Sequence, residues 1–236
     1  IFIGEDLLRL SRALGIYDEY KRYQVEFNNI KSRDIKELQS NGELIFICLL
    51  GKAPFKEDFF IDAPVPDVTG QLYYLRIALP RFAPQPSQAA YAKIYIRGRN
   101  SEENTYLMED ITAIAKKNLE DRIGRITAKA VARVALKFTV AQTAKKAATE
   151  KYGKDAGALV GGLLNIASVA TEQADKRSWR TLPDKIQMSR IVLPPGSYNF
   201  EVHYISAGGE ILEKRVFNDI SIKAGAKKFL TQRIIR

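Results

Sequence analysis

The spacing of apolar residues changes twice along the chain, and this constrains the fold more than any other feature. Residues 91–97 alternate like a β-strand, with Ala92, Ile94 and Ile96 on one face. Between residues 107 and 152 the apolar residues recur near the helical period, and strand-like segments then return. The sequence therefore predicts an α+β fold. Antiparallel sheets or a β-sandwich would draw strands from both ends of the chain, with a long helical hairpin inserted between them.

The N-terminal part is predicted to hold two short helices followed by strands. Residues 5–14 and 16–27 each place apolar side chains along one helical face, and Gly15 separates them. Such a helix pair resembles the end of a tetratricopeptide-like array. Strands are expected at residues 44–50 (buried on both faces), 55–61, 72–79 and 91–97, with Pro64, Pro66, Pro80, Pro84 and Pro86 in the intervening loops.

The inserted helical segment is predicted to contain two helices of different character. The first covers residues 107–152 as one helix or a kinked pair, with Gly124 as the candidate kink and Gly153 as the stop. The second, residues 156–170, is rich in small residues and is too short to span a bilayer. Its glycines at positions 157, 161 and 162 would let another backbone approach closely. Gly157 and Gly161 are therefore candidate packing anchors, either against the preceding helix or against the same helix of another subunit.

The C-terminal part is predicted to be a run of strands separated by turn residues. The expected strands are residues 186–193, 198–206, 211–223 (broken near Asn218) and 228–235. Two domains follow from this organisation. Residues 1–40 would end a helical-repeat region, and residues 41–236 would form one α+β domain, with strands at 43–98, a helical insertion at 107–174 and strands at 185–236.

The net charge of +10 is unevenly distributed. Residues 1–100 hold 14 basic and 12 acidic side chains, whereas residues 109–152 hold 10 and five, and residues 185–236 hold nine and four. A basic helix is often simply solvated, but an excess of this kind also suits a polyanionic partner. Nucleic-acid binding by the helix at residues 116–137 is therefore the alternative function. The basic residues concerned, which we expect to be spread around the helix without an aromatic stacking platform, are Lys116, Lys117, Arg122, Arg125, Lys129 and Arg133.

The sequence offers little that catalysis or cofactor binding needs. The single histidine, His203, falls on the polar face of its predicted strand and is expected to be exposed. The single cysteine, Cys48, lies within an apolar run, where it forms neither an intramolecular disulfide nor a metal cluster. Zinc-ligand spacing, a P-loop and a dinucleotide-binding fingerprint are all absent from the sequence. We therefore predict a protein that is not an enzyme and that carries no cofactor and no metal.

The run of residues 174–183, Ala-Asp-Lys-Arg-Ser-Trp-Arg-Thr-Leu-Pro, contains the chain's one tryptophan. Arg177 and Arg180 flank Trp179, and Asp175 lies just upstream, so a guanidinium could stack on the indole or pair with the carboxylate. One interpretation is a corner clamp, in which the buried indole fills the seam between helices and sheet. The other is an exposed anchor for a partner, because Trp and Arg are enriched at binding hot spots.

Four stretches of the chain together resemble a family of bacterial cell-envelope lipoproteins, which carry helical repeats before a β-rich C-terminal domain. These stretches are residues 6–15, Asp-Leu-Leu-Arg-Leu-Ser-Arg-Ala-Leu-Gly; 51–57, Gly-Lys-Ala-Pro-Phe-Lys-Glu; 77–80, Ile-Ala-Leu-Pro; and the strongest, 177–183, Arg-Ser-Trp-Arg-Thr-Leu-Pro. The resemblance implies an exported, periplasmic protein tethered to the outer membrane through a lipidated cysteine upstream of Ile1. It implies no catalytic residues.

Together these observations predict a non-enzymatic scaffold that acts through protein–protein contacts. The expected partners are other envelope proteins of a larger complex, such as secretion machinery or a cell-wall synthesis complex, and nucleic acid is not the favoured partner. The candidate anchor residues are Asp175, Arg177, Trp179, Arg180, Gly157 and Gly161.

Overall fold

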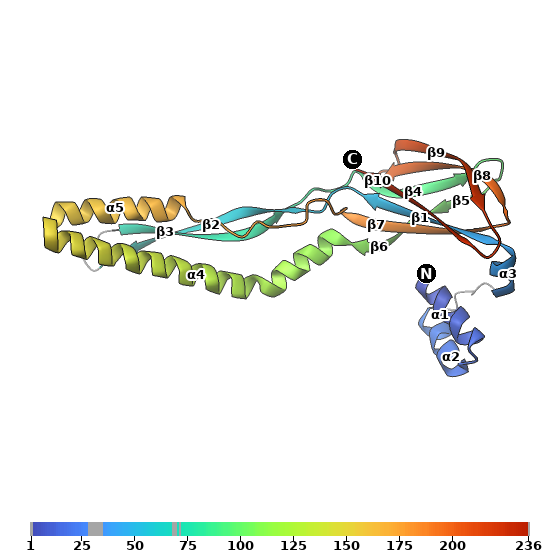
Figure 1. Cartoon of the computed structure of the whole chain (residues 1–236), viewed down its shortest axis with the longest axis horizontal. Helices are drawn as coiled ribbons and strands as arrows, with labels where there is room; N and C mark the ends of the chain where they lie inside the picture. Colours follow the sequence, from blue (N-terminus) through green and yellow to red (C-terminus); the bar gives the residue numbers. More distant parts are fainter. Residues whose placement is uncertain (1, 28–34, 68–69, 71, 236) are drawn as a thin grey trace. The chain divides into compact units, whose positions relative to one another are not determined.

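The computed structural model describes residues 2–27, 35–67, 70 and 72–235, which form two compact units (Figure 1). The sandwich unit comprises Ile1–Lys52, Pro86–Asp110 and Pro183–Arg236. The hairpin unit comprises Ala53–Gln85 and Ile111–Leu182. The expected boundary near residue 40 differs from this division, since the N-terminal helices group with the C-terminal strands and the inserted helices group with two strands of their own.

The sandwich unit is built from two four-stranded sheets that take strands from both ends of the chain. One sheet has the order β10-β1-β7-β6, with β10 at Lys227–Ile234, β1 at Gly42–Leu50, β7 at Lys185–Leu193 and β6 at Tyr106–Asp110. The other has the order β5-β4-β8-β9, with β5 at Glu102–Asn104, β4 at Ala89–Ile96, β8 at Gly196–Ser206 and β9 at Ile211–Ile222. The predicted α+β class is confirmed.

Alternating side chains from both sheets meet in one apolar core. Ala92, Ile94 and Ile96 of β4 are buried as their alternation predicts, and Phe200, Val202 and Tyr204 of β8 lie in the same core. The predicted break in β9 is confirmed as a bulge, because Asp219 takes a φ of 56° where the pairing with β8 shifts register.

One strand pair departs from the expected antiparallel arrangement. β1 pairs in parallel with β10 and antiparallel with β7. Parallel neighbours need a long connection, and here most of the chain lies between them. Leu44, Phe46, Cys48 and Leu50 of β1 are buried in the core, whereas Ile47 and Leu49 on the other face are only partly buried, so the burial expected on both faces is incomplete.

The N-terminal helices are α1 (Phe2–Ala13), α2 (Tyr17–Glu26) and α3 (Ile35–Ser40), of which α3 was not expected. Leu8 of α1 is fully buried. Arg190 of β7 donates from Nη1 to Asp6 Oδ1 of α1 at 2.9 Å and from Nε to Glu43 Oε2 of β1 at 2.6 Å. The bond to Asp6 ties α1 to β7 within the sandwich unit, and the bond to Glu43 ties β7 to β1. Residues 28–34 of the expected 1–40 region lie outside the described residues.

The hairpin unit pairs a two-stranded ribbon with two helices. The ribbon consists of β2 (Phe55–Pro66) and β3 (Leu72–Ala83), and the helices are α4 (Ile111–Tyr152) and α5 (Lys154–Ala170). The expected helix start at residue 107 is wrong, because that residue belongs to β6. The expected stop at Gly153 is confirmed. Gly124 does not divide the segment into two helices, because α4 continues without a break on both sides of it. Among the described residues, no helix has the length and apolar composition needed to cross a membrane.

The prolines expected in loops lie partly within the ribbon. Pro64 and Pro66 belong to β2 and Pro80 belongs to β3. In a two-stranded ribbon each strand has an outer edge, where a missing N–H breaks no ladder bond. The loop prediction for these three prolines was therefore wrong.

The glycines of α5 permit close packing within the hairpin unit. A Cβ on Gly157 would collide with Thr149 of α4, and one on Gly161 would lie 2.9 Å from the Tyr73 hydroxyl of β3 and 3.1 Å from Lys145 Cδ of α4. Gly162 has no such neighbour within 4 Å. Of the two open alternatives, the intramolecular hairpin is the one observed, and Gly162 takes no part in it.

We expect Gly161→Leu to overpack this seam and lower the free energy of unfolding by about 1–3 kcal/mol, measured by thermal or urea melting. Gly162→Leu is the matched control, because open space surrounds it and leucine favours helix over glycine by nearly 1 kcal/mol. Equal destabilisation by both substitutions would contradict the packing assignment.

Candidate interaction site

Residues 174–182 form an irregular strap of the hairpin unit, held along β2. Asp58 of β2 accepts hydrogen bonds from the backbone N–H of Ala174 at 2.8 Å and from Lys176 Nζ. The Lys176 bond, followed by the Ala174 bond, lowers the pKa of Asp58. The strap therefore begins at a fixed point on the ribbon.

Asp175 and Arg177 form a closed local pair within the strap. The Asp175 carboxylate accepts from Arg177 Nε at 2.9 Å, Nη2 at 2.8 Å and the Arg177 backbone N–H at 3.1 Å. These bonds lower the pKa of Asp175 well below its usual range. The predicted carboxylate–guanidinium pair is confirmed for Arg177. Its side chain remains 91% exposed, so the guanidinium is oriented yet open to a ligand.

Trp179 is 72% exposed, so the corner-clamp interpretation is wrong. Its indole Nε1–H donates to Thr181 Oγ1 at 2.6 Å, so the strap itself satisfies this donor. Arg180 lies over Phe55 of β2, 5.6 Å from the ring centroid, instead of stacking on the indole. The indole is thus held at the surface by its bond to Thr181, and Arg180 makes its contact with the ribbon instead.

A groove of 580 Å³ opens beside Trp179, and the indole forms part of its lining. Its apolar lining comes from the ribbon, the first half of α4 and the strap, and includes Phe82, Ile114 and Ile126. Five cationic side chains also line it, and among the described lining residues only Asp175, already paired with Arg177, is acidic. The cations are Lys56, Arg122, Arg125, Lys129 and Arg177. We call this the basic groove.

The basic residues of α4 do not behave as one set. Arg122, Arg125 and Lys129, at i, i+3 and i+7, share the basic groove with Phe82 and Trp179. The expectation that they spread around the helix without an aromatic platform is therefore wrong for these three. The others lie elsewhere: Lys116 in a separate hollow, Lys117 paired with Asp121 at 3.0 Å, and Arg133 paired with Glu172 at 3.2 Å.

Three contributors to this region were missed from the sequence. Lys56 belongs to the Gly51–Glu57 motif, and its position in that motif was the available signal. No sequence signal identified Phe82 or Asp58, because their roles depend on the tertiary packing of the ribbon against α4 and the strap.

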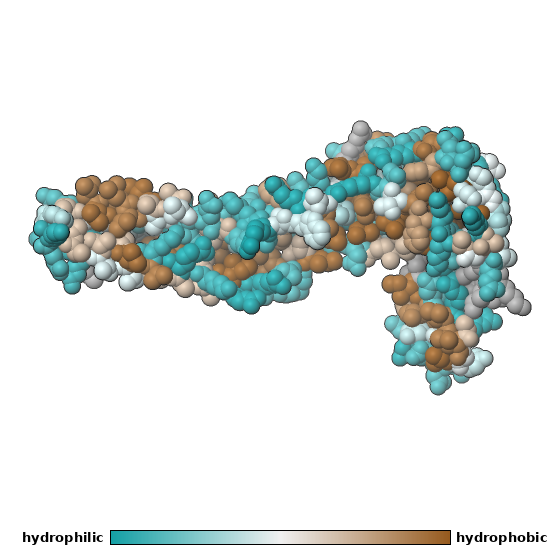
Figure 2. All heavy atoms as spheres, in the orientation of Figure 1, coloured by the Kyte–Doolittle hydropathy of each residue, from teal (hydrophilic) through white to brown (hydrophobic). Residues whose placement is uncertain are grey.

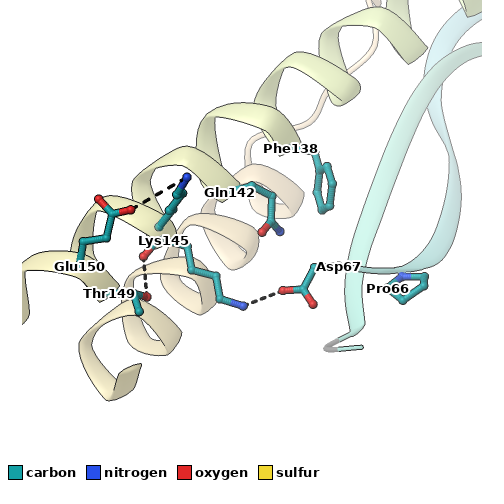
Figure 3. A pocket seen from close by; sticks show the side chains of 8 residues that line it. Pro66, Asp67, Phe138, Gln142, Lys145, Thr149 and Glu150 are labelled. Carbon is teal, nitrogen blue, oxygen red and sulfur yellow. Dashed lines mark hydrogen bonds and ion pairs between the residues drawn. The ribbon is translucent and has the colours of Figure 1, made fainter. Parts of the chain in front are cut away.

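A second pocket of the hairpin unit, of 540 Å³, is electrostatically different (Figure 3). Lys145 Nζ lies 2.6 Å from Asp67 Oδ2, and this bond, together with one to Tyr73, raises the pKa of Lys145. Lys146 and Glu150 at its edge form a second pair. Its charges are thus neutralised internally. Gly157 and Gly161 pack beside Lys145, so their role is structural.

The two residues with the greatest catalytic potential are engaged in the sandwich unit. His203 is half-buried rather than exposed, since its Nε2 lies 2.7 Å from Glu201 Oε1 and its ring packs on Tyr95 with centroids 4.6 Å apart. Burial raises the pKa of the Cys48 thiol to about 12, which keeps it protonated and unreactive. Among the described residues, no group of three or more His, Cys, Asp and Glu side chains could hold a metal ion.

The chain matches no protein-family model, no curated protein and no solved structure. The resemblance to envelope lipoproteins therefore stays a prediction that the motifs alone carry.

We expect Trp179→Ala to lower the free energy of unfolding by at most about 1 kcal/mol, because it removes an exposed ring and one exposed hydrogen bond. Phe200→Ala is the comparison: this fully buried ring should cost about 3–5 kcal/mol. Urea denaturation of both variants measures the difference, and a comparable loss for Trp179→Ala would place the indole in the core.

Asp58 should make the stability of the strap depend on pH in the acid range. With its pKa lowered in the folded state, the stabilisation from Asp58 is complete above the ordinary value of 3.8 and is lost as the pH falls through the lowered value. Asp58→Asn should therefore lower the melting temperature at pH 6 and flatten its decline between pH 4 and pH 2. Trp179 fluorescence reports on the strap, and Asp121→Asn on α4 is the control. An unchanged acid profile in Asp58→Asn would exclude this anchoring role.

Proposed function

We propose that the protein is a non-enzymatic scaffold that binds an acidic segment of a partner protein in the basic groove. The observation that carries this proposal is the exposed Trp179 at the rim of a groove lined by five cations. A large exposed aromatic ring beside oriented guanidinium groups is the composition found at binding hot spots.

Charge and shape both favour an acidic peptide. Arg177 is held by Asp175 but leaves its outer face open, and Arg122, Arg125 and Lys129 present three further cations from one side of α4. Phe82 and Ile126 offer an apolar floor for an aromatic or aliphatic side chain. A segment that alternates carboxylates with apolar residues would satisfy both sets of contacts.

Nucleic acid is the second candidate, and one observation favours it. Phe82 and Trp179 provide aromatic surfaces within the same groove as the three α4 cations. Backbone phosphates and stacked bases need this combination. The two candidates differ in salt dependence and in their response to a purely phosphate-bearing ligand.

We further propose that the protein works in the periplasm, at the outer membrane, within a larger envelope complex. The motifs at residues 6–15, 51–57, 77–80 and 177–183 support this part of the proposal. The N-terminus of the full-length gene product and cell fractionation test it. A signal peptide that ends in a lipid-accepting cysteine supports the proposal, and a plain cytosolic start contradicts it.

The binding experiment uses a labelled peptide of alternating Glu and Leu residues, followed by fluorescence anisotropy at 50 mM salt. The triple substitution of Arg122, Arg125 and Lys129 by Gln should weaken binding about tenfold or more, as for three ion pairs of about 0.5–1 kcal/mol each. The matched control replaces the exposed Lys117, Lys146 and Lys151 by Gln and changes net charge equally. It should leave binding within about threefold.

Two results would overturn the acidic-peptide proposal. Equal loss in both triple variants would mean that net charge, not the groove, attracts the peptide. Tight oligonucleotide binding that falls steeply with salt, with no peptide binding, would establish the nucleic-acid function instead.

A further inference from the structure

The outward side of α5 is entirely apolar. Within residues 156–170, every exposed residue is Ala, Leu or Ile: Ala158, Leu159, Leu163, Leu164, Ile166, Ala167 and Ala170. Leu159, Leu163 and Ile166 are 65%, 59% and 67% exposed and follow i, i+4, i+7 spacing on one face. Figure 2 shows these apolar atoms gathered over α5. The charged residues of α5, Lys154 and Asp155, lie in its first turn.

The opposite side of α5 fixes this orientation. Gly157 and Gly161 lie against α4 and β3, and Asn165 pairs with the backbone of Tyr74 on β3. Its side-chain amide donates to the Tyr74 carbonyl at 2.9 Å and accepts from the Tyr74 N–H at 3.4 Å. Rotating the helix to bury its leucines would break these contacts. The apolar face therefore stays directed outward.

The net charge of the hairpin unit indicates which kind of partner could cover this apolar face. The unit holds 17 basic and 10 acidic side chains, a net charge of +7. A second copy would carry the same net positive charge, which opposes association of two such units, whereas an anionic surface attracts the unit as a whole. Protein interfaces also carry about one hydrogen bond per 100–200 Å², and no exposed side chain within residues 156–170 offers a donor or acceptor.

Amphipathic residues border the apolar face. At its start Tyr152 is 69% exposed, with Lys151 Nζ 5.1 Å from its ring centroid, and Lys154 follows. Along its side, Tyr74 and Arg76, which is paired with Asp62 at 2.7 Å, line one hollow together with Ile166. Tyr, Lys and Arg in these positions suit the headgroup level of a bilayer, where an apolar stem and a polar tip are both satisfied.

We propose that α5 lies in the interface of a bilayer that contains anionic lipids, with Leu159, Leu163 and Ile166 among the acyl chains. The helix does not cross the membrane; it rests in the interface plane, as an amphipathic interfacial helix does. This surface is separate from the basic groove and does not depend on the partner proposed for it.

The test measures co-sedimentation with vesicles of phosphatidylcholine containing 30% phosphatidylglycerol, in the whole chain. Leu159→Glu with Leu163→Glu should weaken partitioning about tenfold or more, because two buried leucines are lost and two like charges added. The matched control is Leu136→Glu with Val140→Glu, also at i, i+4 spacing and 66% and 58% exposed on α4. It should stay within about threefold of the unsubstituted protein, and binding of the Glu-Leu peptide should be unchanged in both.

A second measurement does not depend on the folding of the double variant. In a Trp179→Phe background, Leu163→Trp should shift its emission to the blue on vesicle addition and be quenched by brominated lipid. Absence of both effects, equal loss in the two double variants, or no vesicle binding by the unsubstituted protein would overturn the proposal. Conversion of a dimer to a monomer by the α5 substitutions, without lipid binding, would assign the face to a second copy.

Discussion

A two-stranded β-ribbon is marginal by itself in water, and the hairpin unit depends on how the ribbon formed by β2 and β3 is covered. One face packs against α4, where Tyr73 of β3 meets Phe138 with ring centroids 5.8 Å apart. The outer edge of β3 is covered at Tyr74 by the Asn165 side chain of α5, which bonds both backbone groups of that residue in place of a further strand. On β2 the arrangement is reversed, because the Asp58 side chain of the strand holds the backbone N–H of Ala174 in the strap.

The position of the basic groove follows from the Asp58 anchor. Because Ala174 and Lys176 are held on β2, the next residues must run beside the ribbon and the first half of α4. The Asp175–Arg177 pair and the Trp179–Thr181 bond then turn two large side chains outward within five residues. Each of these polar bonds is local, so the strap needs no apolar core of its own. Its exposed aromatic ring and its oriented cation are consequences of the same short-range bonding.

Local periodicity predicted the elements that have one buried face and one solvated face. The alternation of β4 identified Ile94 as a core residue, because a one-residue slip would exchange the two faces. It could not predict the parallel pairing of β1 with β10, which joins distant parts of the chain. Nor could periodicity predict whether Trp179 is buried or exposed, since an indole is common both in apolar cores and at binding surfaces. The groove depends on Lys56, Arg122 and Arg177 meeting from three segments, and no spacing in the sequence encodes that meeting.

α5 combines two features that oppose each other in a helix that only needs to be stable in water. Glycine at positions 157, 161 and 162 disfavours the helix by about 1 kcal/mol each relative to alanine, and a continuous apolar face in water gains nothing from burial. The first cost is offset at Gly157 and Gly161 by close approach to α4 and β3. Within the described residues, nothing offsets the exposure of the apolar face. Such local conflicts with stability are expected where function rather than folding selects the residues. Close packing on one side and apolar exposure on the other are also linked mechanically, because the glycine contacts hold the leucines at the surface. Larger residues at 157 and 161 would keep α5 farther from α4 and leave the Asn165 bonds to Tyr74 to hold the apolar face outward.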